Sequence, residues 1–227
     1  MDTIGFDVIS DLHLSPDDSF NWESKATSLY CIVAGNVSSD MRMLYQTLDH
    51  LARFYQGIFY ITGSAEYEGA DSIPLRTAEI TTICRRIRNL ALLINNVVII
   101  DGVAVMGANG WYGQSLPDNE MNTVRQFEDI SYLGHSMEKL QLHQDVKKIV
   151  VVTNSVPDPT LYFGEADDDI YNHLPPSVCL SNDTEKKVSH WVYGTYTKIV
   201  DTTVSGINYV NNSCYKRRPY WAKRIDV

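Results

Sequence analysis

Ile4-Gly5-Phe6-Asp7-Val8-Ile9 is a short, mostly apolar run that ends at the tetrapeptide Ser10-Asp11-Leu12-His13. A run of this length and composition is typical of a buried β-strand. Similar runs occupy residues 29–34, 58–61 and 149–153, and each ends at glycine or small polar residues. The polar residues that follow these runs are where a binding site is expected, because ligands of open α/β folds lie beyond the carboxyl ends of the strands.

Helical patterns separate the apolar runs. From Met41 to Phe54 the apolar residues recur at helical spacing, and Asp40 precedes them as a ready N-cap. Further helices are predicted over residues 77–90, 124–132, 135–146 and 183–190, and closing strands over 191–193, 198–201 and 207–210. Asp101-Gly102 lies between two β-branched runs, which predicts a two-residue hairpin. Together these patterns favour one α/β domain over residues 1–227, with one mixed sheet or two.

Composition and charge exclude several classes of protein. The chain has 227 residues, 44% hydrophobic and 21% charged, which excludes collagen, low-complexity disorder and a disulfide scaffold. Its net charge of −9 argues against a general nucleic-acid binder. No signal peptide or membrane-spanning run is evident, and the four scattered cysteines are expected to be buried free thiols. We therefore expect a cytoplasmic protein with no membrane contact.

The strand ends carry an ordered series of short motifs. They read Asp11-Leu12-His13, Gly35-Asn36, Gly63-Ser64-Ala65-Glu66, Asn154 and Gly194-Thr195-Tyr196-Thr197. In order and spacing this series resembles the five signatures of the calcineurin-like metallophosphoesterases: Asp-x-His, Gly-Asp, Gly-Asn-His-Glu/Asp, a lone His, and Gly-His-x-His. The resemblance covers nearly the whole chain and implies that family's α/β sandwich, with two mixed β-sheets flanked by helices in the layer order αββα.

The resemblance also implies a two-metal centre for phosphoester hydrolysis, but most of its ligands are replaced. Asp11 and His13 stand at the positions of the first metal's ligands. Elsewhere, uncharged residues stand at the positions of the bridging aspartate, the asparagine ligand, the catalytic histidine and three histidine ligands: in that order Asn36, Ser64, Ala65, Asn154, Thr195 and Thr197. Two of the seven expected ligands are retained.

Electrostatics decide whether the remaining residues can hold two metals. Two doubly charged ions about 3.5 Å apart repel each other by roughly 5 kcal/mol even in water, and more in a cleft. One aspartate without a bridging carboxylate cannot offset that repulsion. The replacements can instead hydrogen-bond to one another and to nearby backbone, which would satisfy a polar cleft. We therefore predict a catalytically inactive relative, a pseudoenzyme with no metal or other cofactor, that serves as an interaction or structural module.

Two alternatives remain open at the level of sequence. Asp11 and His13 could hold one divalent metal, such as Mn or Mg, and support residual hydrolysis of a phosphate ester or nucleotide. The cleft could also bind a phosphate or nucleotide without reaction. The extent of ligand loss and the 14 tyrosines suit a viral or phage-encoded copy, located in the host cytoplasm or the virion.

The C-terminal segment is the candidate contact for a protein partner. Residues 216–227 hold five basic residues and one acidic residue, whereas the rest of the chain carries −13. The segment mixes basic residues with the aromatic Tyr220 and Trp221, and the basic residues are Lys216, Arg217, Arg218, Lys223 and Arg224. Such a segment can bind an acidic protein face, and nucleic acid is a less favoured partner. Alternatively, the segment packs on the acidic body of its own chain.

Overall fold

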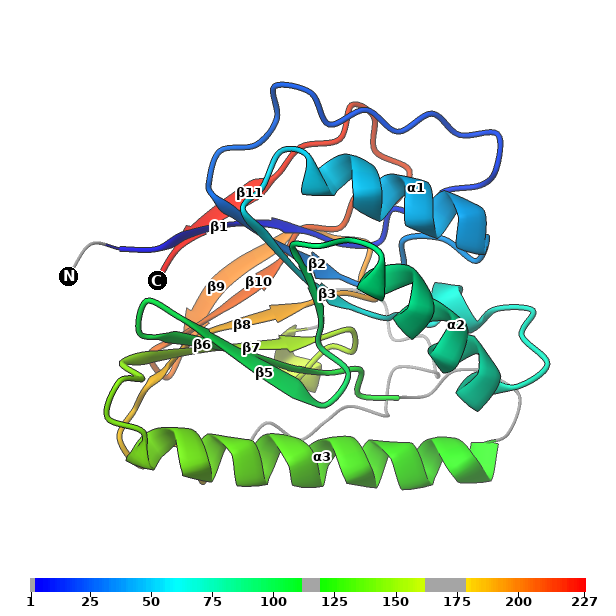
Figure 1. Ribbon diagram of the computed structural model, residues 1–227. Helices are drawn as coiled ribbons and strands as arrows, with labels where there is room; N and C mark the ends of the chain where they lie inside the picture. The colour runs from blue at the N-terminus through cyan, green and yellow to red at the C-terminus, as the bar shows by residue number, and fades with distance from the viewer. Residues whose placement is uncertain (1–2, 112–118, 162–178) are drawn as a thin grey trace.

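Two β-sheets stack face to face with helices on both outer faces (Figure 1), as the sequence predicts. The computed structural model describes residues 3–111, 119–161 and 179–227. The first sheet has the order β11-β1-β2-β3-β4 and contains β1 (Gly5–Ile9), β2 (Tyr30–Ala34), β3 (Gly57–Ile61), β4 (Leu90–Leu92) and β11 (Lys223–Asp226). The second has the order β5-β6-β7-β8-β10-β9 and contains β5 (Asn96–Ile100), β6 (Val103–Ala108), β7 (Lys148–Thr153), β8 (Val188–Tyr193), β9 (Val200–Val204) and β10 (Ile207–Asn211).

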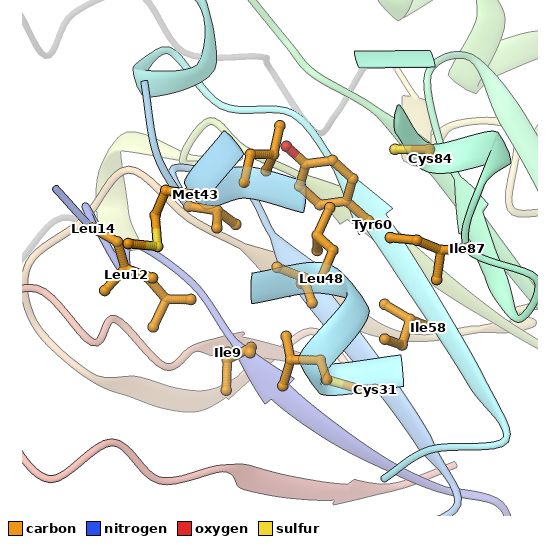
Figure 2. Close-up of a cluster of buried hydrophobic side chains, with 14 of the residues drawn as sticks. Ile9, Leu12, Leu14, Cys31, Met43, Leu48, Ile58, Tyr60, Cys84 and Ile87 are labelled. Carbon is orange, nitrogen blue, oxygen red and sulfur yellow. The ribbon is translucent and has the colours of Figure 1, made fainter. Parts of the chain in front are cut away.

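Three apolar layers hold the sandwich together. Between the sheets lies a layer that includes Phe6, Ile32, Val105 and Val152. The helices α1 (Met41–Ala52) and α2 (Ile73–Arg85) cover the first sheet, and Figure 2 shows the side chains buried there. The long helix α3 (Asn119–Leu142) covers the second sheet (Figure 1). This arrangement leaves the carboxyl ends of the parallel strands β1, β2, β3, β7 and β8 free to build a site.

The local signals in the sequence account for the central elements. β1, β2, β3 and β7 occupy the four apolar runs, and β5 and β6 form the antiparallel hairpin around Asp101-Gly102. Both turn residues have positive φ, 45° and 84°, as that turn requires. Asp40 caps α1, since its Oδ1 accepts a hydrogen bond from the Met43 N–H at 2.7 Å. The four cysteines are buried free thiols.

The two predicted helices at 124–132 and 135–146 are one continuous helix, α3. The expected break falls near Gly134, which instead allows a close contact. The Asn182 Nδ2 donates to the Gly134 carbonyl at 3.1 Å, and a Cβ on Gly134 would lie 3.2 Å from that nitrogen. The glycine therefore marks a packing contact inside the helix and does not end it.

Other boundaries in the sequence prediction were wrong. The helix predicted over 183–190 is a turn followed by β8, because the buried Asp183 carboxylate accepts from the Lys187 and Val188 N–H groups. Pro74 stands in the first turn of α2, which begins earlier and ends before Leu90 begins the short strand β4. β11, which no apolar pattern marks, pairs antiparallel with β1. None of the helices in the described ranges is long and apolar enough to cross a membrane.

Candidate functional site

The predicted site residues meet in one cleft of about 320 Å³ at the carboxyl ends of the strands. Its lining consists of Asp11, His13, Asn36, Ser64, Thr195, Tyr196, Thr197, Ser213 and Tyr215. Six of the eight predicted positions are in this lining. The other two, Ala65 and Asn154, hydrogen-bond to lining residues from behind.

Asp11 is a buried residue of the cleft lining, and both of its carboxylate oxygens are hydrogen-bonded. Its Oδ1 accepts from the Asn36 Nδ2 at 2.8 Å and the Thr195 N–H at 2.9 Å. The Ser10 hydroxyl donates to Oδ2 at 2.7 Å. Burial raises the pKa of Asp11 from its ordinary value, and these hydrogen bonds oppose the increase. The carboxylate is therefore held by donors from three different loops.

The orientation of the Asn36 side chain follows from its other contacts. Its Oδ1 accepts from the Ala65 N–H at 2.9 Å and from the Ser64 hydroxyl at 3.2 Å. A backbone N–H can only donate, so the amide oxygen faces Ala65 and the NH₂ group faces Asp11. Asn36 therefore presents hydrogen atoms to Asp11 where, according to the family resemblance, a bridging carboxylate would face two cations.

Asn154 supports Thr195, which lines the cleft. The Thr195 hydroxyl donates to the Asn154 Oδ1 at 2.6 Å, and the Asn154 Nδ2 donates to the Ala34 carbonyl at 2.9 Å. Gly194 permits this approach, because a Cβ there would lie 2.2 Å from the Ala34 oxygen. The predicted hydrogen bonding among the replacement residues is confirmed for Asn36, Ser64, Asn154 and Thr195. The Thr197 side chain is exposed.

Glu66 is a buried residue that holds two loops of the site together, and the sequence analysis assigns it no role. Its carboxylate accepts from the N–H groups of Gly63 and Val37, each at 2.6 Å, and of Asn36 at 3.1 Å. Burial raises the pKa of Glu66 to about 7, although these N–H groups favour the charged form. Glu66 thus joins the loops that follow β2 and β3. Its only signal in the sequence is a carboxylate within the motif Gly63-Ser64-Ala65-Glu66.

Several residues of the cleft have strained backbone conformations. Asp11, His13, Asn36 and Thr195 have φ angles of 54°, 45°, 57° and 56°. The left-handed region costs a residue with a Cβ on the order of 1 kcal/mol. Hydrogen bonds hold the loops in place, for example from the His13 N–H to the Asn36 carbonyl at 2.9 Å. Strain of this kind is common where loops present side chains to a ligand.

His13 lies apart from the Asp11 hydrogen bonds, at the exposed rim. Its ring packs edge to face on Tyr215, with 5.2 Å between the centroids. Near the same rim, the Arg217 Nη2 donates to the Thr197 carbonyl at 3.4 Å. The cleft therefore combines hydrogen-bonded polar side chains around Asp11 with an exposed rim that contains the rings of His13 and Tyr215 and lies near Arg217.

A pair of divalent cations, which the family resemblance implies, does not fit this donor set. Among the described residues that line the cleft, Asp11 is the one carboxylate. Asn36 presents N–H groups, and the Asn154 oxygen already accepts from Thr195. No group of three or more His, Cys, Asp or Glu side chains suited to a metal occurs in the described ranges. The donor set therefore does not support a hydrolytic step through a pair of metals here.

The basic C-terminal segment is part of the folded body. Lys223 forms an ion pair with Asp201, Arg224 forms one with Asp226 at 2.8 Å, and Arg218 approaches Asp18 at 3.6 Å. Lys216 and Arg217 have no ion pair within the described residues. They stack instead over Tyr215 and Trp221, with 5.0 and 5.9 Å from the cation to the ring centroid. Much of the segment's charge is thus neutralised within the chain.

The α/β sandwich that the resemblance implies is confirmed: two mixed sheets are flanked by helices, as in solved structures with a similar fold. No family model and no curated protein matches the sequence. Among solved structures, phosphopantetheinyl hydrolase (PptH) from Mycobacterium tuberculosis is similar, with a TM-score of 0.69 and 15% identity over 98% of this chain and 96% of that one.

Two further structures share the fold. A putative 5'-nucleotidase from Staphylococcus aureus has a TM-score of 0.59 and 15% identity, covering 92% of this chain and 48% of that one. GAP50 of Plasmodium, described as the anchor in the inner membrane complex, has a TM-score of 0.55 and 8% identity, covering 94% of this chain and 72% of that one. At these identities the similarity defines the fold alone.

Proposed function

We propose that this chain is a non-catalytic protein with the metallophosphoesterase fold, a pseudoenzyme that serves as an interaction or structural module. The observation that carries the proposal is the orientation of Asn36. Its NH₂ group donates to Asp11 at 2.8 Å, while its oxygen is held by the Ala65 N–H. The amide thus supplies the contact to Asp11 that the cations of an active relative would supply.

The rest of the cleft supports the same proposal. Thr195 and Asn154 bond to each other, and Thr195 bonds through its backbone to Asp11. Buried polar groups that satisfy one another need neither metal nor water to offset their burial. The description of GAP50 as an anchor adds that a protein of this fold can serve an assembly.

The partner contact proposed for this module is the rim around Lys216 and Arg217, where the cations have no carboxylate partner within the described residues. An acidic protein face is the complementary surface. The proposal extends to a viral or phage-encoded source and to a cytoplasmic or virion location, for which the composition is the support.

Residual single-metal hydrolysis is the second candidate, because Asp11 and His13 line the same cleft. The test is hydrolysis of bis(p-nitrophenyl) phosphate with Mn²⁺, using wild type and His13→Asn. Asparagine tolerates the positive φ of His13, so this variant removes the imidazole and keeps the loop.

We expect both proteins to give the rate of Mn²⁺ in buffer alone. Turnover by wild type that His13→Asn abolishes would establish the enzyme and contradict the proposal. An authentic metallophosphoesterase, assayed in parallel, verifies the substrate and metal.

A further inference from the structure

A groove of about 560 Å³ lies between α2 and the outer edge of the first sheet, away from the cleft. α2 contributes Thr77, Thr81, Cys84 and Arg85, and the segment after it contributes Ile87 and Arg88. β4, the turn that follows and the first residue of β5 contribute the other wall, formed by Leu90, Leu92, Ile94, Asn95 and Asn96. Figure 2 shows Cys84 and Ile87 on the inner side of this region, near Tyr60 of β3.

The wall formed by β4 is an open strand edge. β4 is the outermost strand of its sheet. The Asn89 carbonyl and the Leu93 N–H bond to β3, at 2.8 and 2.7 Å. Because the direction of backbone groups alternates along a strand, those of Leu90 and Leu92 point away from β3.

Two of these outward groups already have partners. The Leu90 N–H donates to the Ile87 carbonyl at 3.3 Å, and the Leu92 carbonyl accepts from the Asn96 Nδ2 at 3.3 Å. The Leu90 carbonyl and the Leu92 N–H are left without a partner within the described residues. One acceptor and one donor, two residues apart, are the groups that an added strand requires.

The charge of the groove is opposite to that of the molecule. Arg85 and Arg88 are exposed and form no ion pair within the described residues, whereas Arg76 on the same helix approaches Glu79 at 3.4 Å. The described lining contains no carboxylate, although the chain has a net charge of −9. Two uncompensated guanidinium groups beside an open strand edge therefore complement an acidic strand.

The floor of the groove is apolar. Cys84 and Ile87 are buried, with 3% and 4% of their surfaces exposed. Leu90, Leu92 and Ile94 are half-buried, so their remaining apolar surface borders the groove. An occupant that also buries aliphatic side chains would gain from covering this surface.

We propose that this groove binds an extended acidic peptide segment of a protein partner, which adds to β4 as a strand and places carboxylates on Arg85 and Arg88. Nucleic acid fits less well, because the described lining has no aromatic ring for base stacking and the acidic body repels a polyanion. The inference names a partner class for the non-catalytic role and in that sense rests on it. It can fail separately, because peptide binding is measured without reference to metals or hydrolysis.

The test is fluorescence anisotropy with a labelled, capped heptapeptide in which Asp and Val alternate. Arg85→Glu/Arg88→Glu should weaken binding about tenfold or more, because the double substitution replaces two attractive charge contacts with two repulsive ones. Arg86→Glu is the matched control, because Arg86 is exposed at the same helix end but does not line the groove. It should change the affinity by less than about twofold.

Two further peptides are tested on the wild-type protein, so that misfolding of a variant cannot be mistaken for a loss of binding. A peptide with Lys in place of Asp tests the charge, and one with alternating Pro tests the strand, because proline cannot donate to an edge. Both should fail to bind. Absence of saturable binding to the Asp/Val peptide, an equal loss with Arg86→Glu, or tighter binding of a single-stranded RNA through the same arginines would each overturn the proposal.

Discussion

Asn36→Asp is the substitution that most directly probes the contact with Asp11. It replaces the NH₂ group that donates to the Asp11 Oδ1 at 2.8 Å with a carboxylate oxygen. Two charges about 4 Å apart at an effective dielectric constant of 20 repel by about 4 kcal/mol. The pair can avoid this repulsion by binding one proton, which costs about 4 kcal/mol at pH 7 and about 1.5 kcal/mol at pH 5 for a carboxyl of ordinary pKa. The protonated Asp would restore the hydrogen bond, so this cost is the expected loss of stability.

Urea unfolding of wild type and Asn36→Asp at both pH values measures the effect. Asn21→Asp is the matched control, because Asn21 is exposed and its side-chain oxygen already accepts from the Glu23 N–H at 2.8 Å. That variant should change the free energy of unfolding by less than about 0.5 kcal/mol. Millimolar Mn²⁺ should stabilise Asn36→Asp by mass action and leave wild type unchanged. The reasoning is refuted if Asn36→Asp is as stable as wild type at pH 7, or if Mn²⁺ stabilises wild type equally.

Three other outcomes are expected. The free energy of unfolding should fall by up to about 3 kcal/mol as the pH rises from about 4.5 to about 7. The reason is that the buried Glu66, with its pKa raised to about 7, binds its proton more tightly in the folded state than in the unfolded state. A rise in the free energy of unfolding, measured by urea unfolding across that pH range, would contradict this. Restoring the family ligands together should create a metal site that calorimetry detects. A folded variant that binds no metal would show that at least one family motif has been assigned to the wrong strand end. The substitutions are Asn36→Asp, Ser64→Asn, Ala65→His, Asn154→His, Thr195→His and Thr197→His. Charge reversal at Arg218 and Arg224, which face Asp18 and Asp226, should lower stability only slightly, because exposed ion pairs contribute little. Reversal at Arg217 should weaken co-purification of an acidic partner in a salt-dependent way, and an unchanged partner profile would mean that the segment only packs.

The central strands could be predicted because strands that are buried on both faces consist of consecutive apolar residues. Strands such as β2 and β7, covered on both faces, read as continuous apolar runs, and the Asp101-Gly102 turn marks its own hairpin. β4 and β11 could not be predicted in this way. β4 follows directly from a helical pattern, and β11 contains two basic residues and pairs with β1 at the other end of the chain.

The residue types of the site, and the fact that they hydrogen-bond to one another, were predictable, but the partner and direction of each bond were not. The strand-end motifs bring Asp11, Asn36 and Thr195 to the same end of the sandwich, because β1 and β2 of the first sheet and β8 of the second all end there. The direction of the Asn36 amide depends on the Ala65 N–H, 29 residues away, and on a loop position that only the fold supplies. Glu66 is similar, since its three N–H donors come from two loops and its place in a strand-end motif does not reveal that it is buried.

Metal content of the wild-type protein is the most direct measurement of the central claim. The purified chain, dialysed against Mn²⁺ and then against metal-free buffer, would be analysed by inductively coupled plasma mass spectrometry. With Asn36 donating to Asp11 and the described cleft lining holding one carboxylate, we predict far less than one Mn, Fe, Zn or Ni atom per chain. The restored variant, treated in parallel, shows that retained metal is detectable. One or two retained metal atoms per wild-type chain, lost on substitution of Asp11, would contradict the account.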